Sequence, residues 1–417
     1  MNAAGPQSSP RFRLSLLPAL LGALAVAVSL ALPLAAHAAE AIRIGEINSQ
    51  GRSSSAGQAY SKGLALALEQ INESGGIHGR PLQLVTREDQ GDADQAARNA
   101  RELVSKEHVD VLTGTMLSDV ALTVAREAAR SKTVLVVGDA LSDAITLDKG
   151  NRYTFRVRPS TYMLAAMLAE QAVRMPGRRW AMVAPNYEYG QSAVASFKML
   201  LKQARPDVEF VNDQWPALGK IKADDVVRAI GQSRPDAIFN ATFGEDLQKF
   251  VQAGNRQQLF NGVRVVSMTS PGPQSLDASQ SEAIRDWLAV GYPWEQINTP
   301  EHQRFLEAYL KKFSERPQLQ AVLGYSTMMA IATGLKKSDG AAGEALLEAL
   351  RGLHWSSPLG ELSFRALDQQ STMGAFVGLV SQKDGRSTMR DWHYLDGAAY
   401  LPPPTYVRGR RPASAAR

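Results

Sequence analysis

Two tyrosines stand close together after a short apolar run in the stretch "MVAPNYEYGQSA" (182–193). The run stops at Pro185 and Gly190 leads into a helical pattern, so Tyr187 and Tyr189 fall on a loop between a strand and a helix. On such a loop the pair could form a catalytic corner, an aromatic wall for a ligand, or ordinary packing. Tyr187 could also simply buttress the loop that presents Tyr189.

Small hydroxyl side chains mark two other loops. Ser118 in "TGTMLSDVALT" comes just before a helix expected from about Val120, and Ser142 in "DALSDAIT" follows the next apolar run. Unpaired N–H groups at a helix start favour an anionic group beside such a hydroxyl. The alternative is that Ser118 or Asp119 only caps the helix. Because two successive strands both end in such loops, the sequence supports an anion site as well as capping.

Motifs of the common α/β enzymes are absent from the chain. There is no GxGxxG after a strand, no GxxxxGK[ST], no GxSxG and no HExxH. The absence of cysteine excludes thiol nucleophiles, thiolate metal sites and disulfides. The histidines are scattered singly, and acidic pairs such as Asp92/Asp94 lie at expected helix starts, where carboxylates cap free N–H groups. We therefore expect no catalytic residue, no metal ion and no cofactor.

The elements that position these loops alternate between strand and helix patterns. Apolar runs such as "AIRIGEI" and "VDVLTG" are separated by segments with apolar residues on one helical face, and the alternation restarts after Arg158. This order predicts an α/β fold with parallel sheets covered on both faces. Two such series favour two lobes. Helices at 299–315, 321–336 and 341–350 follow, and then an antiparallel hairpin with "KDGR" at its turn.

The two ends of the chain differ in composition from its body. Arg11 and Arg13 precede an apolar run that ends at "AHA" (36–38), which predicts a cleaved signal peptide over 1–38, with an uncleaved membrane anchor as the alternative. These two arginines and the four in the last 17 residues supply six positive charges, and the rest of the chain has 40 basic and 41 acidic residues, which gives the net charge of +5. The balanced body gives no reason to expect nucleic acid. We expect 398–417 to be a disordered basic tail, with weak membrane-surface contact as a minor alternative.

Four long motifs together resemble the type I periplasmic solute-binding proteins, in particular the leucine/isoleucine/valine-binding branch. They are "GLALALEQINESGGIHGRPLQLVTREDQGD", "VLTGTMLSDVALTVAREAARSKTVLVV", "NYEYGQSAVASFKMLLK" and "DAIFNATFGEDLQKFVQAG". The likeness covers 42–397. It implies two Rossmann-like lobes joined by three hinge crossovers, a small-molecule ligand held between them, and delivery to an ABC permease. It also implies a periplasmic location, and we expect a monomer.

The resemblance assigns site residues one at a time. Ser118 matches a serine whose hydroxyl and backbone hold the ligand carboxylate. Ser142 matches a threonine that binds the ligand head group, with backbone at Ala140 or Leu141 assisting. Tyr189 matches the tyrosine of the family's "YG" turn, which closes over the ligand. Thr242 and Phe243 match a pair of aromatic positions, of which one is retained.

Two departures concern the charge of the ligand. Branched-chain amino acid binders pair the ligand ammonium with an acid at the end of the strand "RVVSM", where this chain has Thr269. A buried ammonium without a partner is costly. Either Glu245, Asp119 or Asp139 supplies the charge, or the ligand has no ammonium. Asp139 is itself unusual beside a carboxylate cradle, where it repels the ligand unless it points away or meets a cation.

The expected function is capture of a branched-chain amino acid or a related small carboxylate. An aromatic or keto acid without an ammonium competes closely, and a sensory receptor component or an exported enzyme are alternatives of other classes. Lobe 1 is predicted over 39–157 and 292–355, and lobe 2 over 158–291 and 356–397. The hinges are expected near 156–159, 290–293 and 355–362.

Overall fold

Short apolar strands build the first of the two larger sheets. The computed structural model describes residues 40–51, 55–269, 284–383 and 386–415. The chain divides into two units, 1–39 and 40–417, so the predicted signal peptide lies outside the described residues. Five parallel strands pair in the order β2-β1-β3-β4-β5. Their bounds are β1 (Ile42–Asn48), β2 (Leu82–Glu88), β3 (Val111–Gly114), β4 (Val134–Val137) and β5 (Thr154–Arg156).

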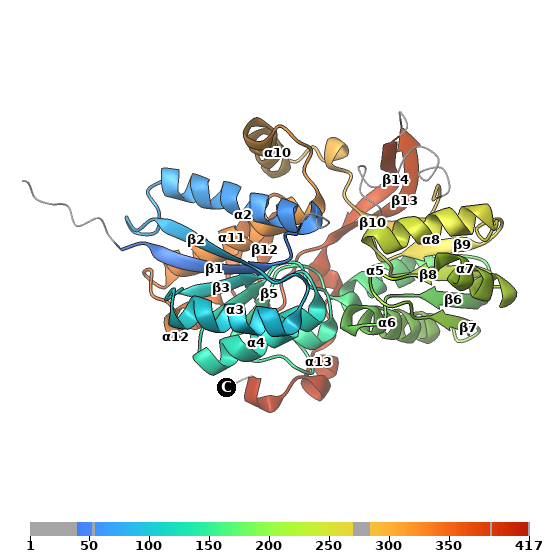
Figure 1. The fold of residues 1–417 in the computed structure, drawn as a ribbon, viewed down its shortest axis with the longest axis horizontal. Helices are drawn as coiled ribbons and strands as arrows, with labels where there is room; N and C mark the ends of the chain where they lie inside the picture. Colours follow the sequence, from blue (N-terminus) through green and yellow to red (C-terminus); the bar gives the residue numbers. More distant parts are fainter. Residues whose placement is uncertain (1–39, 52–54, 270–283, 384–385, 416–417) are drawn as a thin grey trace, which may run out of the picture. The chain divides into compact units, whose positions relative to one another are not determined.

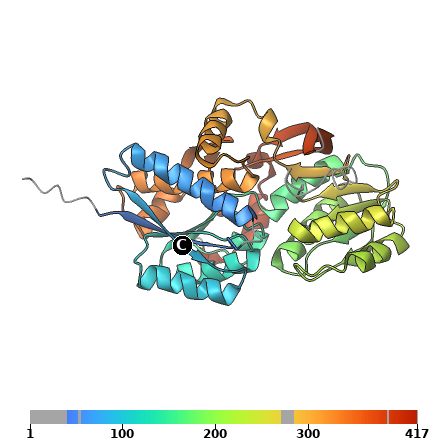
Figure 2. The same ribbon diagram turned by 45° about the horizontal axis from the view of Figure 1, so that its top comes forward.

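Helices cover both faces of this sheet because alternate strand residues point to opposite sides. Ile42 and Ile44 pack under α2, α11 and α12, whereas Ile47 packs under α3 and α4. In Figure 2 the blue helix α2 lies alongside the orange α11. We call the five-stranded sheet and its covering helices, together with α10 beside α2, lobe 1. The helices are α2 (Ser55–Glu73), α3 (Ala93–Ser105), α4 (Ser118–Ser131), α10 (Pro300–Phe313), α11 (Leu319–Lys337) and α12 (Glu344–Leu350).

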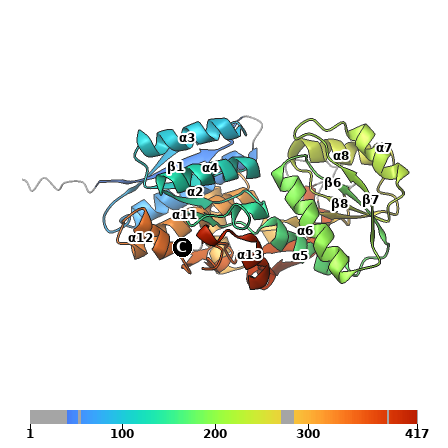
Figure 3. The same cartoon turned by 90° about the horizontal axis from the view of Figure 1, so that it is seen from below.

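The second sheet, with its helices, forms lobe 2. Its strand order is β14-β13-β10-β9-β8-β6-β7, in which β13 and β14 are antiparallel to their neighbours. Helices α5 and α6 cover one face and α7 and α8 the other (Figures 1 and 3). The strands are β6 (Arg179–Val183), β7 (Glu209–Gln214), β8 (Ala237–Asn240), β9 (Arg264–Ser267), β10 (Leu288–Gly291), β13 (Ala375–Lys383) and β14 (Arg386–Leu395), and the helices are α5 (Thr161–Ala172), α6 (Glu188–Ala204), α7 (Ala223–Gln232) and α8 (Gly244–Arg256).

The predicted α/β fold with two lobes is confirmed, and the chain passes between the lobes three times. The first passage follows β5 and the second follows β10. The third lies between Met373, which packs in the core of lobe 1, and Ala375, which packs in lobe 2. The predicted hairpin also forms, with Lys383 paired to Arg386, while the turn residues 384–385 lie outside the described part.

Assignment of 356–373 to lobe 2, with a hinge near 355–362, is therefore wrong. The strands β11 (His354–Ser357) and β12 (Gly360–Ser363) form a separate two-stranded sheet. It buries Trp355 and Leu362, and the following Phe364, in the core beneath α11. These apolar side chains hold the segment on lobe 1.

The expected disorder of the C-terminal tail is also wrong for the described residues up to 415. The segment forms α13 (Pro404–Arg410) between two short 3-10 turns, η3 (Gly397–Tyr400) and η4 (Ala413–Ala415). Tyr406 packs on Tyr162 with ring centroids 5.1 Å apart. Arg411 is buried and donates to the carbonyl oxygens of Thr146, Asp368 and Asn151. These carbonyl acceptors compensate for the burial of the Arg411 charge. The basic composition alone had indicated a solvated segment.

No helix of the described residues combines the length and the apolarity needed to cross a bilayer.

Candidate functional site

A cavity of about 1070 Å³ lies at the carboxyl ends of the strands of both sheets. Lobe 1 contributes the loops after β3 and β4, and lobe 2 contributes the loops after β6, β8 and β9. A further part of the wall comes from Tyr292 and Trp294, which follow the second passage between the lobes. Loops at strand carboxyl ends are where open α/β sheets bind their ligands.

Ser118 reaches this cavity at the start of α4. The loop before it turns sharply at Gly114, with φ of +108°, where an added Cβ would lie 2.2 Å from the Ile47 carbonyl oxygen. Leu117 occupies the N-cap position and makes no side-chain cap, so within the described residues the N-cap side chain leaves the first-turn N–H groups available to a ligand. Ser118 is therefore not the cap that was one of its two predicted roles. Its buried hydroxyl accepts a hydrogen bond from the Ser142 amide at 3.1 Å.

Of the three predicted residues in the next loop, Leu141 lines the cavity and the other two do not. The Ala140 amide donates to the Thr115 carbonyl at 3.2 Å, so it is already engaged. The Ser142 hydroxyl donates to Glu188 Oε1 at 2.8 Å, and the side chain is fully buried. Ser142 thus joins the two lobes through Glu188 of α6 instead of facing the cavity.

The tyrosine loop forms an aromatic wall on lobe 2. Tyr187, Tyr189 and Phe243 all line the cavity. Tyr189 meets Tyr187 at 5.9 Å and contacts Phe243 edge to face at 5.8 Å. Gly190 lets the loop fold back, since an added Cβ would lie 2.0 Å from the Pro185 carbonyl oxygen. Of the roles considered for the two tyrosines, the structure favours an aromatic wall, because both line the cavity.

The hydroxyl of Tyr189 is buried and has no hydrogen-bond partner among the described residues. Burial raises the pKa of this phenol, so it stays a neutral donor at physiological pH. A buried hydroxyl without a partner costs free energy that a ligand acceptor can recover.

Thr269 lines the cavity, whereas Thr242 is buried beneath it. Thr242 Oγ1 donates to Asn240 Oδ1 at 2.6 Å, and Thr269 Oγ1 donates to the Thr242 carbonyl at 3.1 Å. Both hydroxyls thus donate to acceptors within lobe 2, and Thr269 supplies no charge to the cavity. Residues 270–283, which contain the rest of "MTSPGP", lie outside the described part.

Sequence reasoning missed Arg158, whose guanidinium lines the cavity beside Asp139. Its Nη1 donates to Asp139 Oδ1 and, at 3.2 Å, to the Asp139 carbonyl oxygen. The two side chains are only 9% and 4% exposed. No protein acceptor in the described residues reaches Nε or Nη2 of Arg158. Asp139 therefore meets a cation, which was the condition under which it could lie beside a carboxylate cradle.

A signal for this ion pair was present in the sheet register. Val137 of β4 pairs in parallel with Arg156 of β5, so Asp139 and Arg158 lie two residues beyond the ends of adjacent strands. Burial raises the pKa of Asp139, and Arg158 opposes that rise by favouring the ionised form.

The other acids considered as partners of a ligand ammonium are less suited. Glu245 lines the cavity but is exposed and pairs with Lys249 at 2.8 Å. Asp119 is not part of the lining, and its Oδ1 is buried without a partner among the described residues. Asp139 is thus the one acid of the three that is both buried and in the wall.

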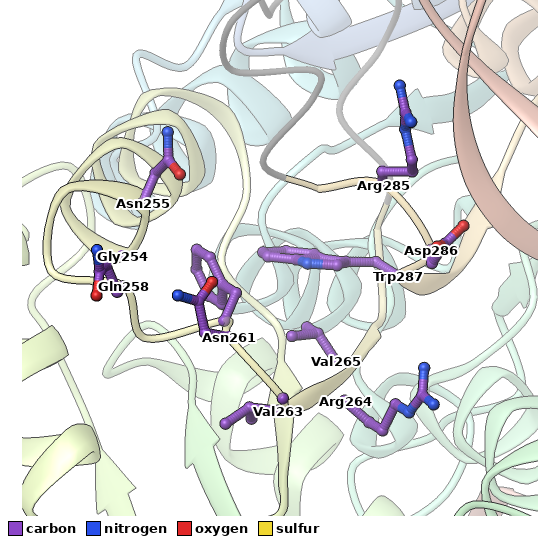
Figure 4. A pocket seen from close by; sticks show the side chains of 12 residues that line it. Gly254, Asn255, Gln258, Asn261, Val263, Arg264, Val265, Arg285, Asp286 and Trp287 are labelled. Carbon is purple, nitrogen blue, oxygen red and sulfur yellow. The ribbon is translucent and has the colours of Figure 1, made fainter.

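A second cavity of about 570 Å³ lies in lobe 2, between the end of α8 and the starts of β9 and β10. Figure 4 shows the indole of Trp287 near the middle of the lining side chains, above Asn261 and Val265 in this view. Its arginines, Arg264 and Arg285, are solvent-exposed. This cavity brings together none of the predicted site residues and lies at the amino ends of its strands. We therefore place the candidate site in the larger cavity. Within the described residues, no cluster of His, Asp and Glu side chains is suited to a metal ion.

Comparison with known proteins gives a consistent set of relatives. Residues 41–386 match the family described as periplasmic binding protein. The Leu/Ile/Val-binding protein homolog 7 of Brucella suis biovar 1 is 25% identical over 346 residues, which span 78% of this chain and 85% of that protein.

Two solved structures share the fold. A solute-binding protein of an ABC transporter from Rhodopseudomonas palustris BisB5, in complex with 3,4-dihydroxy benzoic acid, has a TM-score of 0.75 at 22% identity and covers 86% of this chain and 98% of its own. An amino acid ABC transporter substrate-binding protein from Pseudomonas fluorescens Pf-5 has a TM-score of 0.76 at 21% identity, over 89% and 99% of the two chains.

Proposed function

Because the chain belongs to the periplasmic binding protein family, we propose that it captures a small carboxylate in the cavity between its lobes. As the solute-binding component of an ABC importer, it then delivers the carboxylate to a permease in the inner membrane. It acts in the periplasm as a monomer, after removal of residues 1–38, and makes or breaks no bond in the ligand.

The observation that carries this proposal is the convergence of anion-binding groups at one wall of the cavity. Ser118 and the uncapped start of α4 stand beside a guanidinium with two nitrogens free of protein acceptors among the described residues. A guanidinium and helix N–H groups together suit a carboxylate, which accepts several charge-assisted hydrogen bonds. Across the cavity, Tyr189 and Phe243 supply an aromatic surface.

An acid without an ammonium group is the favoured ligand. Thr269 supplies no charge and Glu245 is already paired with Lys249, so neither residue offers a free carboxylate to a ligand ammonium. An aromatic carboxylate or a keto acid avoids this cost and packs on the aromatic wall. The Rhodopseudomonas palustris protein, crystallised with 3,4-dihydroxy benzoic acid, supports this class.

A branched-chain amino acid is the second candidate, because Asp139 places a buried carboxylate in the cavity wall. In that case Asp139 would face the ammonium while Arg158 holds the carboxylate. The names of the Brucella and Pseudomonas relatives support this alternative.

Thermal unfolding of the exported protein tests the proposal, after the protein has been unfolded and refolded to remove co-purified ligand. The additions are benzoate, 4-methyl-2-oxopentanoate and leucine. A ligand at about 100 times its Kd adds roughly 2.7 kcal/mol of stability, which is readily detected. A shift with either ammonium-free acid supports the favoured class, and a shift with leucine alone supports the second candidate. If a wider panel of carboxylates also produced no shift, carboxylate capture would be refuted.

Transport is separated from sensing by uptake. A strain that lacks the protein should lose high-affinity uptake of the labelled ligand. Retained uptake with a lost transcriptional or motile response would instead indicate a receptor component.

A further inference from the structure

The inference concerns the Arg158–Asp139 ion pair in the cavity wall. It rests on the proposed function, in which the ligand carboxylate binds to Arg158. We propose that Asp139 competes with the ligand carboxylate for Arg158, so that capture of the ligand draws a proton onto Asp139. The affinity for a carboxylate then rises as the pH falls. Asp139 also acts as a selectivity residue, because a ligand that carries its own cation escapes this competition.

The competition is one of charge, because Asp139 already neutralises the guanidinium to which the ligand carboxylate would bind. Arg158 spends Nη1 on Asp139 Oδ1 and on the Asp139 carbonyl oxygen, and no described side chain donates to Oδ2. The guanidinium forms no other ion pair with a described acid. Without ligand, the Arg158–Asp139 pair therefore balances one positive charge against one negative charge in the wall.

A second carboxylate at Arg158 leaves this wall with a net negative charge away from water. Two carboxylates that share one site cannot both stay ionised cheaply, and one pKa of the group is strongly raised. Uptake of a proton by Asp139 restores neutrality. The ligand carboxylate then takes over the guanidinium, and the Asp139 carboxylic acid gains an O–H that can donate to it.

Groups that face Asp139 from the neighbouring elements do not supply another charge. Tyr60 of α2 and Tyr187 at the start of α6 lie close enough to feel its charge, and burial raises the pKa of both phenols. Both hydroxyls therefore stay neutral over the working range of pH. From the first passage between the lobes, Arg158 is the cation.

Two further acids of the cavity wall, Glu88 and Asp246, accept hydrogen bonds from backbone amides. Glu88 accepts from the Gln50 and Gln90 amides at 2.8 and 2.7 Å. Asp246 accepts from the Gly219 amide at 2.7 Å. Neither of these two acids pairs with Arg158, so neither competes with the ligand for its guanidinium.

The sign of the pH effect follows from linkage. Binding raises the pKa of Asp139 above its value in the free protein, so the bound state holds more protons between these two values. Affinity increases as the pH falls through this window, with a limiting slope of about tenfold per pH unit for one proton. The lower limit is set by protonation of the ligand itself, near pH 4 for an ordinary carboxyl.

The test is calorimetric titration of the refolded protein with benzoate, or with 4-methyl-2-oxopentanoate if benzoate does not bind, from pH 5 to 8. Each titration is repeated in two buffers that both hold the pH but differ in ionisation heat, such as MES and phosphate in the lower half of the range and phosphate and Tris in the upper half, so that the protons taken up per ligand are counted. We expect up to one proton per carboxylate and a Kd that tightens as the pH falls.

Asp139→Asn is the informative variant, because the amide oxygen still accepts from Arg158 but cannot titrate or compete as a charge. We expect it to bind the carboxylate at least as tightly as the wild type at pH 7.5, without proton uptake. Asp89→Asn is the matched control. Burial also raises the pKa of Asp89, but its side chain accepts from Ser49 and Gly91 and not from Arg158, so it should keep the wild-type slope.

Three results would overturn the inference. They are carboxylate binding without proton uptake in the wild type, an unchanged slope in Asp139→Asn, and weaker binding by Asp139→Asn, which would mean that Asp139 accepts from a ligand cation. The proton count in the wild type decides the matter if the variant does not fold. Failure of every carboxylate to bind at any pH would refute the proposed function itself, which is a different outcome.

Discussion

At the scale of single residues, Tyr189 separates binding from stability. Its hydroxyl is buried in the wall without a partner in the described residues. Tyr189→Phe should lower the affinity for a carboxylate about fivefold, the worth of one hydrogen bond of about 1 kcal/mol, and leave the unfolding free energy unchanged or higher. Isothermal titration and urea unfolding measure the two effects.

A control for Tyr189→Phe is Tyr325→Phe, which removes a hydroxyl that donates to Gln70 at 2.6 Å outside the cavity. It should reduce stability and leave affinity unchanged. Equal affinities for Tyr189→Phe and the wild type would show that the phenol does not reach the ligand.

His302 should make the fold acid-sensitive. It is fully buried, and its Nε2 lies 2.6 Å from the Tyr292 hydroxyl. Burial lowers the pKa of His302 from 6.5 to about 4, so between these values the unfolded chain binds a proton that the folded chain refuses. Stability should therefore fall as the pH drops through this window, by roughly 3 kcal/mol at most.

Urea unfolding at pH 7 and pH 4.5 measures this effect, with His302→Gln as the non-titrating comparison. The glutamine still offers Tyr292 a partner. The variant should lose part of the acid sensitivity, and an identical pH profile would exclude His302 as its source.

At the scale of elements, α2 and α11 approach so closely that glycine is required at the contact. A Cβ added to Gly324 would lie 2.0 Å from the Tyr60 carbonyl oxygen, which no side-chain movement can relieve. Gly324→Ala should destabilise the protein by about 1–3 kcal/mol through overpacking. Thermal unfolding measures the change.

Gly231 in α7 is the matched control, since its added Cβ would meet only Leu259 Cδ1, at 3.9 Å. Gly231→Ala should stabilise the protein by about 0.5–1 kcal/mol, as alanine favours the helix. A stable Gly324→Ala protein would mean that the two helices can separate.

The positions of most helices and strands can be predicted from the sequence, but the lobe to which each belongs cannot always be. Strands and helices of both sheets are predictable because apolar periodicity is a local property. The lobe to which β11 and β12 belong is not, because it depends on where Trp355 and Leu362 find an apolar surface. At the site, Ser118, Leu141, Tyr189, Phe243 and Thr269 line the cavity, and their contact with a ligand stays a prediction.

Other features of the site could not be predicted from the sequence, because they depend on contacts between segments that are far apart in it. Ser142 and Thr242 carry the expected hydroxyls, but Glu188 and Asn240 accept from them first. The position of Arg158 beside Asp139 depends on the pairing of β4 with β5, which cannot be seen in any single stretch of the sequence.

At the scale of the whole described chain, the C-terminal segment contacts both lobes. Arg410 pairs with Asp148 of lobe 1, and Tyr400 donates to Glu170 of lobe 2 at 2.6 Å. Arg411→Ala should destabilise the protein by about 1–3 kcal/mol, because it leaves buried carbonyl oxygens without a donor. Chemical unfolding measures the loss.

The comparison for that variant is Arg408→Ala, which removes an exposed arginine of α13. It should change stability by no more than about 0.5 kcal/mol. Similar losses in both variants would mean that the effect comes from net charge and not from the buried donors.

The tryptophans of the molecule are distributed so that one of them can report on the cavity. Trp180, Trp287 and Trp355 are buried in the cores, whereas Trp294 lies in the cavity wall with the Arg316 guanidinium 5.8 Å from its ring. Trp215 and Trp392 are not part of that wall. A ligand that displaces water or the guanidinium from Trp294 changes the polarity around one indole while the others keep their surroundings. The fluorescence of Trp294 should thus report whether the proposed site is occupied.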